Sequence, residues 1–252
     1  MISVVCCSID PVRAAAIERH YERLLGDEPY EIVAVRDARS LAEGYNRGVA
    51  RSSGDIVILS HDDIEFLDPV PWLGTLKKHL ADADLVGIVG TTKVVYGSWA
   101  RAGPPYTFGQ VCEPDGQDAP FRVLVCAMPA PLVHGMQAVD GLFMAANREV
   151  LERVRFDEVT FDGFHCYDMD FSFSSHLAGF RLAVAADMPA LHASAGNFDQ
   201  AWEHYAGRFM AKHAASIPPS RRRPFQPSIV GGESKEEALE IMRGPRSQWE
   251  AR

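Results

Sequence analysis

The chain has 252 residues, 47% hydrophobic and 23% charged. These values are typical of a globular protein and exclude a disordered or collagen-like chain. Acidic residues outnumber basic ones by 34 to 25, for a formal net charge of −9, which argues against a broad nucleic-acid-binding face. No apolar stretch reaches the ~18 residues of a membrane span, and no basic segment precedes the first apolar run. We therefore expect no integral membrane enzyme, although peripheral contact with a membrane is compatible with this pattern.

The cysteines suggest a reducing environment. There are five, an odd number, with no Cys-x-x-Cys pair, and the adjacent Cys6 and Cys7 lie inside an apolar run. This pattern is typical of buried, reduced thiols. We expect a cytoplasmic protein, with peripheral contact at the inner membrane face compatible with that location.

Short apolar runs alternate with helical patterns at the start of the chain. Asp10 and Pro11 supply the N-cap and the first position of the first helix. The expected elements are a strand at 2–8, a helix from 11 to 26, a strand at 31–35, a helix from 41 to 54 and a strand at 55–60. This alternation predicts an α/β fold with a doubly wound, mostly parallel sheet flanked by helices in a single domain.

The rest of the chain continues the alternation with one interruption. Residues 97–120 are rich in glycine and proline and predict a long loop, of the kind that forms lids or binding loops. The other expected elements are a helix at 72–81, strands at 86–94 and 121–128, a strand turning into a helix with Asn147 as N-cap at 138–154, a helix at 171–180 and a last strand at 181–194. Residues 218–252 are Pro- and Arg-rich with one short exposed helix, and predict a C-terminal tail or arm after a domain of residues 1–217.

A polar cluster follows the third predicted strand. Ligands in open α/β sheets bind beyond the carboxyl ends of the strands, and these ends carry Ser8, Asp37 and the run His61-Asp62-Asp63. In an extended segment residues i and i+2 point the same way, so His61 and Asp63 share one face. Such side chains suit a divalent ion whose other ligands are substrate phosphates. The alternative is a pair of solvated carboxylates capping the next turn.

Two further patterns contain candidate catalytic or metal-binding residues. Asp168 and Asp170 precede an apolar helix, where one could be a base and the other an N-terminal cap, or both could be caps. His192 follows the last strand. A lone histidine in such a position is more often a packed residue than a ligand, so both interpretations stay open.

The ordered set of these motifs resembles the family 2 glycosyltransferases, which have the GT-A fold. The resemblance covers Ile2 to about His213 and rests on ISVVCCS, EGYNRGVARSSGDIVILSHDDIEF, VDGLFMAANREVL, YDMDF and LHAS. Two features depart from the family pattern. The Asp-x-Asp metal motif appears as His61-x-Asp63, and the Glu-Asp pair appears as Tyr167-Asp168.

The resemblance implies transfer of a sugar, with inversion, from a nucleotide-diphosphate sugar to an acceptor hydroxyl of a glycan, a lipid-linked sugar or another compound. It implies a divalent cation, manganese or magnesium, held by Asp63, His192 and His61, and Asp168 as the catalytic base. The implied nucleotide-sugar contacts are Ser8, Asp37, Asn46, Asp62, Trp99, Asp140 and Gly141.

The same resemblance divides the domain into a nucleotide-sugar-binding half, residues 1–96, and an acceptor-side half, residues 97–217. Two alternative functions stay open. A sugar-1-phosphate nucleotidyltransferase needs a Gly-rich loop after the first strand, where this chain reads CSIDPVRAAAI without glycine. A non-catalytic nucleotide-sugar-binding module is disfavoured by the presence of Asp168 together with Asp63 and His192.

Overall fold

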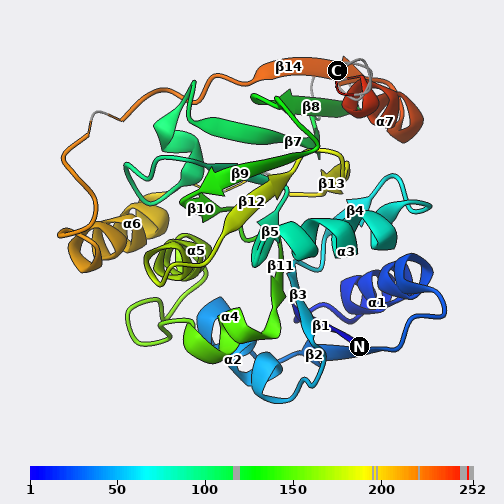
Figure 1. Ribbon diagram of the computed structural model, residues 1–252, viewed down its shortest axis with the longest axis horizontal. Helices are drawn as coiled ribbons and strands as arrows, with labels where there is room; N and C mark the ends of the chain where they lie inside the picture. Colours follow the sequence, from blue (N-terminus) through cyan, green and yellow to red (C-terminus); the bar gives the residue numbers. More distant parts are fainter. Residues whose placement is uncertain (116–119, 195, 197, 221, 245–248, 250–252) are drawn as a thin grey trace.

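The computed structural model describes residues 1–115, 120–194, 196, 198–220, 222–244 and 249. Two seven-stranded sheets lie side by side, with helices packed around them (Figure 1). The α/β fold in a single domain, expected from the sequence, is confirmed. The described helices are α1 (Pro11–Leu25), α2 (Leu41–Ala50), α3 (Trp72–Asp82), α4 (Arg148–Arg153), α5 (Tyr167–Leu177), α6 (Gln200–Lys212) and α7 (Lys235–Arg243).

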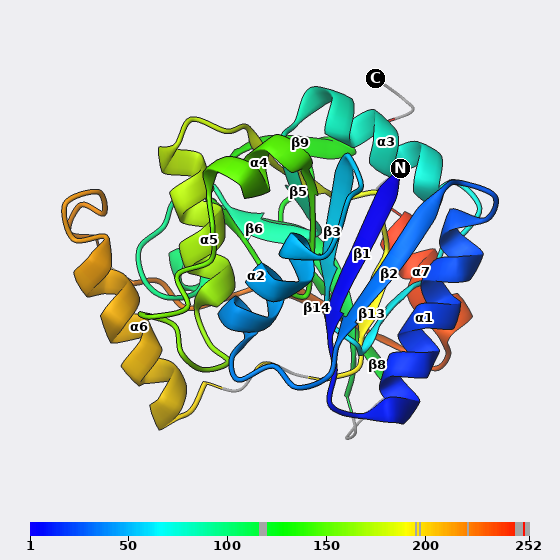
Figure 2. The same ribbon diagram turned by 90° about the horizontal axis from the view of Figure 1, so that it is seen from below.

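The first sheet is doubly wound but mixed in direction. Its strands are, in spatial order, β2 (Tyr30–Val35), β1 (Ile2–Cys7), β3 (Ile56–Ser60), β11 (Phe143–Asn147), β5 (Leu85–Gly87), β12 (Leu182–Ala185) and β9 (Leu132–Met136). Strand β1 is parallel to β2 and β3, and β5 is parallel to β12. Strand β11 enters antiparallel between β3 and β5, so the sheet is not mostly parallel. Helices α1 and α3 cover one face, and α2, α4 and α5 cover the other (Figures 1 and 2).

Of the strands in the second sheet, the sequence pattern predicted β8 (Phe121–Val125) and merged or missed the others. The sheet contains β10 (Ala138–Val139), β6 (Val89–Thr91), β7 (Thr107–Pro114), β13 (Ala190–His192), β4 (Ile64–Phe66), β8 and β14 (Ser228–Gly232). The apolar runs at 86–94 and 181–194 each divide into two strands, β5 with β6 and β12 with β13, one in each sheet. A bend that moves a strand between sheets leaves the apolar run intact, so hydrophobic periodicity does not reveal it.

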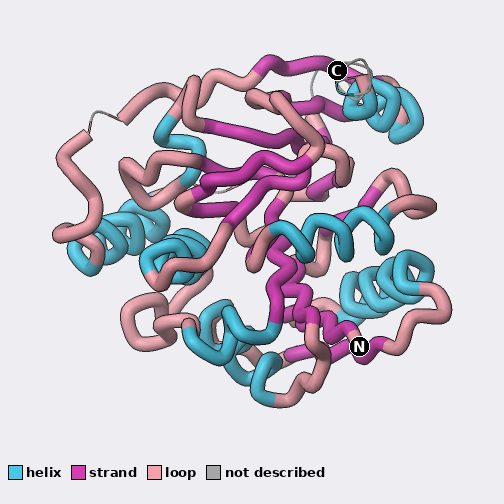
Figure 3. The backbone as a smooth tube through the Cα atoms, viewed as in Figure 1, coloured by secondary structure: helices cyan, strands magenta, loops and turns pink. Residues whose placement is uncertain are grey.

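The predicted loop at 97–120 is wrong for much of its length. A short 3₁₀-helix covers Trp99–Ala102, and β7 lies inside the second sheet between β6 and β13 and also pairs with β8 (Figure 3). Two of the glycines that suggested a loop instead allow the backbone to bend, because Gly103 and Gly109 have positive φ values of +59° and +98°. A Cβ at Gly109 would also overlap the Ile88 carbonyl oxygen, so glycine is needed there for conformation and for space.

The C-terminal segment is also more integrated than a tail. Strand β14 pairs antiparallel with β8, and the helix predicted at 233–244 is α7, which buries Ala238 and Met242 against a small second core. This core includes Cys112 and Leu191. The segment therefore differs from the expected exposed arm, because α7 has an apolar face that needs a partner.

All five cysteines are free thiols, as expected for reduced thiols. Among the residues that the structure describes, no helix has both the length and the apolar character required to cross a membrane.

Candidate active site at the ends of β3, β13 and α5

The polar cluster lies where β3 ends and the chain turns into β4. His61, Asp62 and Asp63 occupy this turn, and β4 pairs antiparallel with β13 so that Ile64 faces His192. The Ala193 N–H donates to the Asp63 carbonyl oxygen at 2.9 Å. Residues about 130 positions apart in the chain are thereby brought together at one edge.

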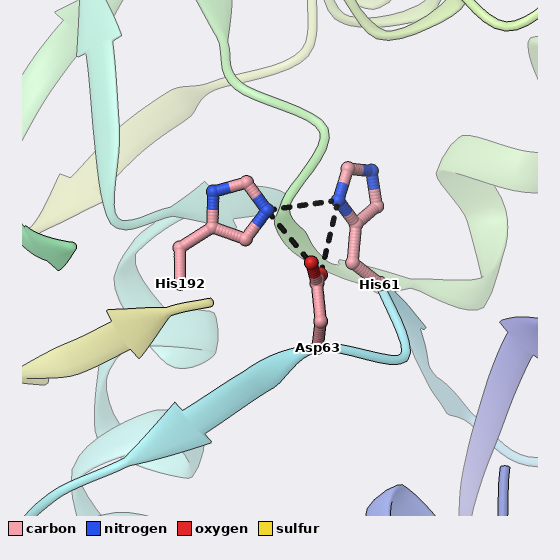
Figure 4. Close-up of side chains that lie close together, drawn as sticks. All are labelled: His61, Asp63 and His192. Carbon is pink, nitrogen blue, oxygen red and sulfur yellow. Dashed lines mark hydrogen bonds and ion pairs between the residues drawn. The ribbon is translucent and has the colours of Figure 1, made fainter. Parts of the chain in front are cut away.

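His61, Asp63 and His192, hereafter the metal group, converge on one point (Figure 4). His61 Nδ1 lies 3.4 Å from His192 Nε2, and Asp63 Oδ1 lies 3.3 Å from His192 Nε2 and 3.9 Å from His61 Nδ1. Ligand atoms at about 2.0–2.2 Å from one ion are separated from each other by about 3–3.6 Å. Two of the three separations match this range and the third is slightly longer, so the group fits a divalent cation.

Electrostatics favour the metal-binding ionisation states of Asp63 and His61, whereas the hydrogen bond and charge of Asp63 outweigh burial and raise the pKa of His192, so a cation would have to displace a proton from His192. Burial raises the pKa of the Asp63 carboxyl, but its hydrogen bond to His192 and the charge of that imidazole outweigh burial and hold the pKa well below its usual range. Burial lowers the pKa of His61, and the neighbouring His192 lowers it further. Asp63 is therefore a carboxylate and His61 a neutral imidazole, which are the forms that bind metals.

Tyr167 orients His61, a role that the sequence interpretation missed. Its phenol oxygen lies 2.7 Å from His61 Nε2. When Nε2–H donates to this oxygen, Nδ1 presents its lone pair to the metal group. Tyr167 occupies the position where the family pattern has an acidic residue. This departure from the pattern was the one signal in the sequence that pointed to a special role for Tyr167.

The carboxylate of Asp168 lies at the start of α5. Its Oδ2 accepts a hydrogen bond from the Gly141 N–H at 2.9 Å. Burial and the nearby Asp140 carboxylate raise the pKa of Asp168 to about 7, although backbone N–H groups oppose the shift. A carboxylate with a pKa near 7 suits a general base at neutral pH.

Gly141 allows this arrangement because it has no side chain. A Cβ at this position would overlap the Tyr167 phenol oxygen and lie 2.7 Å from Asp168 Cβ. The backbone before β11 therefore passes directly against the first turn of α5, and only glycine fits.

A small pocket connects the metal group with the proposed base. It has a volume of about 130 Å³, and its lining includes His61, Trp99, Asp140, Tyr167 and Asp168. Trp99 Nε1 donates to Asp140 Oδ2 at 2.7 Å, and Asp140 Oδ1 accepts from the Leu142 N–H. Trp99 is largely buried, so its ring edge forms part of the pocket wall.

Ser8 and Asp62 form a second polar group beside the metal group. The Ser8 hydroxyl donates to the Asp62 carboxylate. Arg13 Nη1 lies 3.8 Å from carboxylate oxygens of both Asp62 and Asp63. The sequence interpretation overlooked this arginine, although it follows the first strand by only a few residues. A guanidinium here places a positive charge suitable for phosphate oxygens.

Two expected donor contacts have other partners. Asp37 is largely exposed and pairs with Arg47 of α2 at 2.8 Å. The Asn46 amide donates to the Phe156 carbonyl oxygen and to Glu158, and accepts from the Phe156 N–H. All three hydrogen bonds tie α2 to a neighbouring segment, and these contacts support a structural role for Asn46.

Asp170 belongs to a buried ion cluster and not to the pocket. Its carboxylate accepts from His213 Nε2 at 2.7 Å and from Lys212 Nζ at 2.9 Å. The residue at the N-cap of α5 is Cys166, so neither Asp168 nor Asp170 is the cap. Asp170 instead anchors the end of α6 to α5.

Comparison with known proteins supports this assignment of fold. A glycosyltransferase-like family model matches residues 3–213. The mannosyltransferase PcManGT from Pyrobaculum calidifontis, solved in complex with GDP-Man and Mn²⁺, superposes with a TM-score of 0.51 at 17% identity and covers 86% of this chain. TarS from S. aureus, solved in complex with UDP-GlcNAc, has a TM-score of 0.48 at 11% identity, with 78% of this chain and 59% of TarS covered.

The chain spans 66% of the mannosyltransferase, slightly less than two thirds of its length. No curated protein matches the sequence. The family model alone covers most of the chain and includes every residue of the metal group, together with Asp140, Gly141 and Asp168. The resemblance noted in the sequence is thereby confirmed, and this chain belongs to the glycosyltransferase-like family.

Proposed function

We propose that this protein transfers a sugar from a nucleotide-diphosphate sugar to an acceptor hydroxyl, with inversion at the anomeric carbon and with a bound divalent cation. The observation that carries the proposal is the shared pocket. It places Asp168, with its pKa raised to about 7, in the same small cavity as His61 of the metal group.

The metal group would hold the cation through His61 Nδ1, Asp63 and His192 Nε2. A divalent cation bound there would act as a Lewis acid that neutralises charge developing on the leaving diphosphate. The candidates are manganese and magnesium, and the structure of the mannosyltransferase with GDP-Man and Mn²⁺ supports manganese. The two imidazoles favour manganese of the two, because imidazole suits transition ions better than magnesium.

Asp168 would accept the proton of the acceptor hydroxyl. Proton transfer to a positioned base contributes typically 10²–10⁴ in rate. The Gly141 N–H fixes one carboxylate oxygen of Asp168. Direct attack by that hydroxyl, without a covalent sugar intermediate on the protein, accounts for inversion.

On the donor side, Ser8 and Asp62 would contact the nucleoside, and Arg13 would contact the diphosphate. Asp140 and Trp99 would contact the sugar at the pocket wall. Asp37 stays a candidate for the outer part of the nucleoside, although its carboxylate pairs with Arg47. We expect the acceptor to be a glycan, a lipid-linked sugar or another hydroxyl compound, and the site to lie in the cytoplasm.

The test is a thermal-shift screen of UDP, GDP, dTDP and CMP sugars, each with and without manganese. A ligand that binds the folded state raises the melting temperature by mass action, so the correct donor should give a manganese-dependent rise. Asp63→Asn should abolish that rise. Asp82→Asn, an exposed carboxylate on α3, is the matched control and should retain it.

Product analysis then separates the enzyme from a binding module. Transfer with the chosen donor supports the proposal, and the configuration of the product tests inversion. Donor binding without turnover over a broad panel of acceptors would instead identify a non-catalytic nucleotide-sugar-binding module.

A further inference from the structure

Outside the site described above, positive charge gathers in one cleft. The segment between α6 and β14, which runs along the upper left of the molecule in Figure 1, forms one wall. The cleft has a volume of about 630 Å³. Its charged lining residues are Lys93, Arg222 and Arg223, joined by Ser220 and Gln226, and no acidic residue lines it among those described.

These three cations lack carboxylate partners. Many arginines and lysines of this acidic protein form ion pairs, but among the described residues no carboxylate pairs with Lys93, Arg222 or Arg223. Their contacts are with aromatic rings. Arg222 Cζ lies 3.3 Å from the centre of the Tyr96 ring, and Lys93 Nζ and Arg223 Cζ lie 5.0 and 5.3 Å from that of Tyr106.

Cation–π contacts hold a charged group in place without neutralising it. Lys93 and Arg223 both contact the ring of Tyr106, which holds two positive charges in the cleft without neutralising them. In a chain with a formal net charge of −9, an uncompensated cluster of this kind is stabilised by an anion that binds between the charges.

Hydrogen bonds hold the segment that carries the arginines against its neighbour. The Arg223 N–H donates to the Arg101 carbonyl oxygen at 3.0 Å, and Arg223 Nη1 donates to that of Pro104 at 2.9 Å. A Cβ at Gly103 would lie 2.7 Å from Arg223 Cβ, so the two segments are in direct contact. The cleft therefore has a defined shape before any ligand binds.

A ring contact links the segment that carries the arginines to the pocket of the proposed active site. Phe225 follows the two arginines, and its ring packs edge-on against Trp99 with 5.2 Å between centres. Trp99 in turn donates to Asp140 in the pocket. Through Phe225 and Trp99, the segment that carries the arginines therefore contacts the wall of that pocket.

We propose that this cleft binds a phosphate or diphosphate group carried by the acceptor. Arginine recognises phosphate through its planar fork of N–H donors and lysine as a point charge, and three such groups suit an anion with two or more charges. The assignment to the acceptor rests on the proposed glycosyl transfer, whereas anion binding in the cleft does not. The phosphate could belong to a soluble molecule or to a lipid headgroup, which present the same chemistry.

The test measures binding of inorganic pyrophosphate by calorimetry with a chelator present, so that no metal ion contributes. The triple variant Lys93→Gln, Arg222→Gln and Arg223→Gln should bind pyrophosphate at least ~10-fold more weakly, and binding to the parent should weaken as salt screens the charges. A triple variant that removes three exposed cations elsewhere, Arg51→Gln, Lys78→Gln and Arg155→Gln, should bind like the parent. Equal binding by the cleft variant, or no binding by the parent, overturns the proposal.

Two further measurements separate the sources and the hypotheses. Co-sedimentation compares vesicles that contain phosphatidic acid with vesicles of phosphatidylcholine alone. If the parent binds the phosphatidic acid vesicles and the cleft variant does not, the ligand is a lipid headgroup. If the parent binds pyrophosphate but not the vesicles, the ligand is a soluble molecule. Manganese-dependent donor binding should be unchanged in the cleft variant. If donor binding fails in the parent while pyrophosphate binds in the cleft, the glycosyl-transfer proposal is wrong and the anion site stands.

Discussion

The phenol oxygen of Tyr167 lies 2.7 Å from Nε2 of His61. This contact joins the first turn of α5 to the end of β3. The next residue of α5 is Asp168, so one helix terminus both orients a member of the metal group and presents the proposed base. Any displacement of α5 would therefore disturb both parts of the site.

Tyr167→Phe tests this link. The ring and its packing stay, but the hydrogen bond to His61 Nε2 is lost, so the imidazole is free to rotate or to change tautomer. Loss of such an outer partner typically costs 10–100-fold in metal affinity. We expect manganese affinity, measured by calorimetry, to fall by about 10-fold. Tyr205→Phe, which removes the hydroxyl that contacts Asp162 on the surface, is the control and should leave manganese binding unaltered. Unchanged affinity in Tyr167→Phe would show that packing alone orients His61.

Asp168→Asn tests the base. Asparagine keeps the size of the side chain but cannot take a proton from the acceptor hydroxyl. We expect transfer under saturating donor and metal to fall by at least ~10², the lower end for general-base catalysis, while donor binding changes little. Turnover at the parental rate would exclude Asp168 as the base and make Asp140 the next candidate.

The pH dependence of transfer follows from the same residue. Burial and Asp140 raise the pKa of Asp168 to about 7, and only the ionised form can accept a proton. The rate should therefore be low at pH 5–6 and rise through about pH 7 to a plateau. A pH–rate profile at saturating substrates measures this. A flat profile from pH 5 to 8 would contradict the assignment of Asp168.

Asp170→Asn should affect stability more than chemistry. The Asp170 carboxylate is buried and paired with His213 and Lys212, so its loss breaks a buried ion pair, although Lys212 keeps its contact with Asp157. Breaking such a pair typically costs about 3–5 kcal/mol, and we expect denaturant unfolding to show a loss of about 3 kcal/mol.

Asp168→Asn is the matched comparison for stability. Because its folded-state pKa is raised above that of an unfolded chain, ionised Asp168 destabilises the fold progressively as pH rises from about 4 to about 7. Replacing it with a neutral amide should leave stability at pH 8 unchanged or slightly higher. A greater loss in Asp168→Asn than in Asp170→Asn would contradict the division of roles.

The sequence alone determined the first sixty residues of the fold, because the signals there are local. Asp10 caps α1 by accepting from the Val12 N–H, and Ser40 caps α2 by accepting from the Glu43 N–H, both at the predicted positions. Apolar β-branched runs predicted β1, β2 and β3 within one or two residues. The ordered motifs were also sufficient to place the chain in its family.

The tertiary structure decided which polar side chains meet. His61 and His192 are 131 positions apart, and His61 and Tyr167 are 106 apart; their contacts depend on how β4 pairs with β13 and where α5 begins. Asn46, expected to contact the donor, and Asp170, an alternative to Asp168 as the base, bind other partners instead. Local pattern fixes a backbone conformation over a few residues, whereas the chemistry of the site depends on side chains that only the packing of distant strands and helices brings within hydrogen-bonding distance.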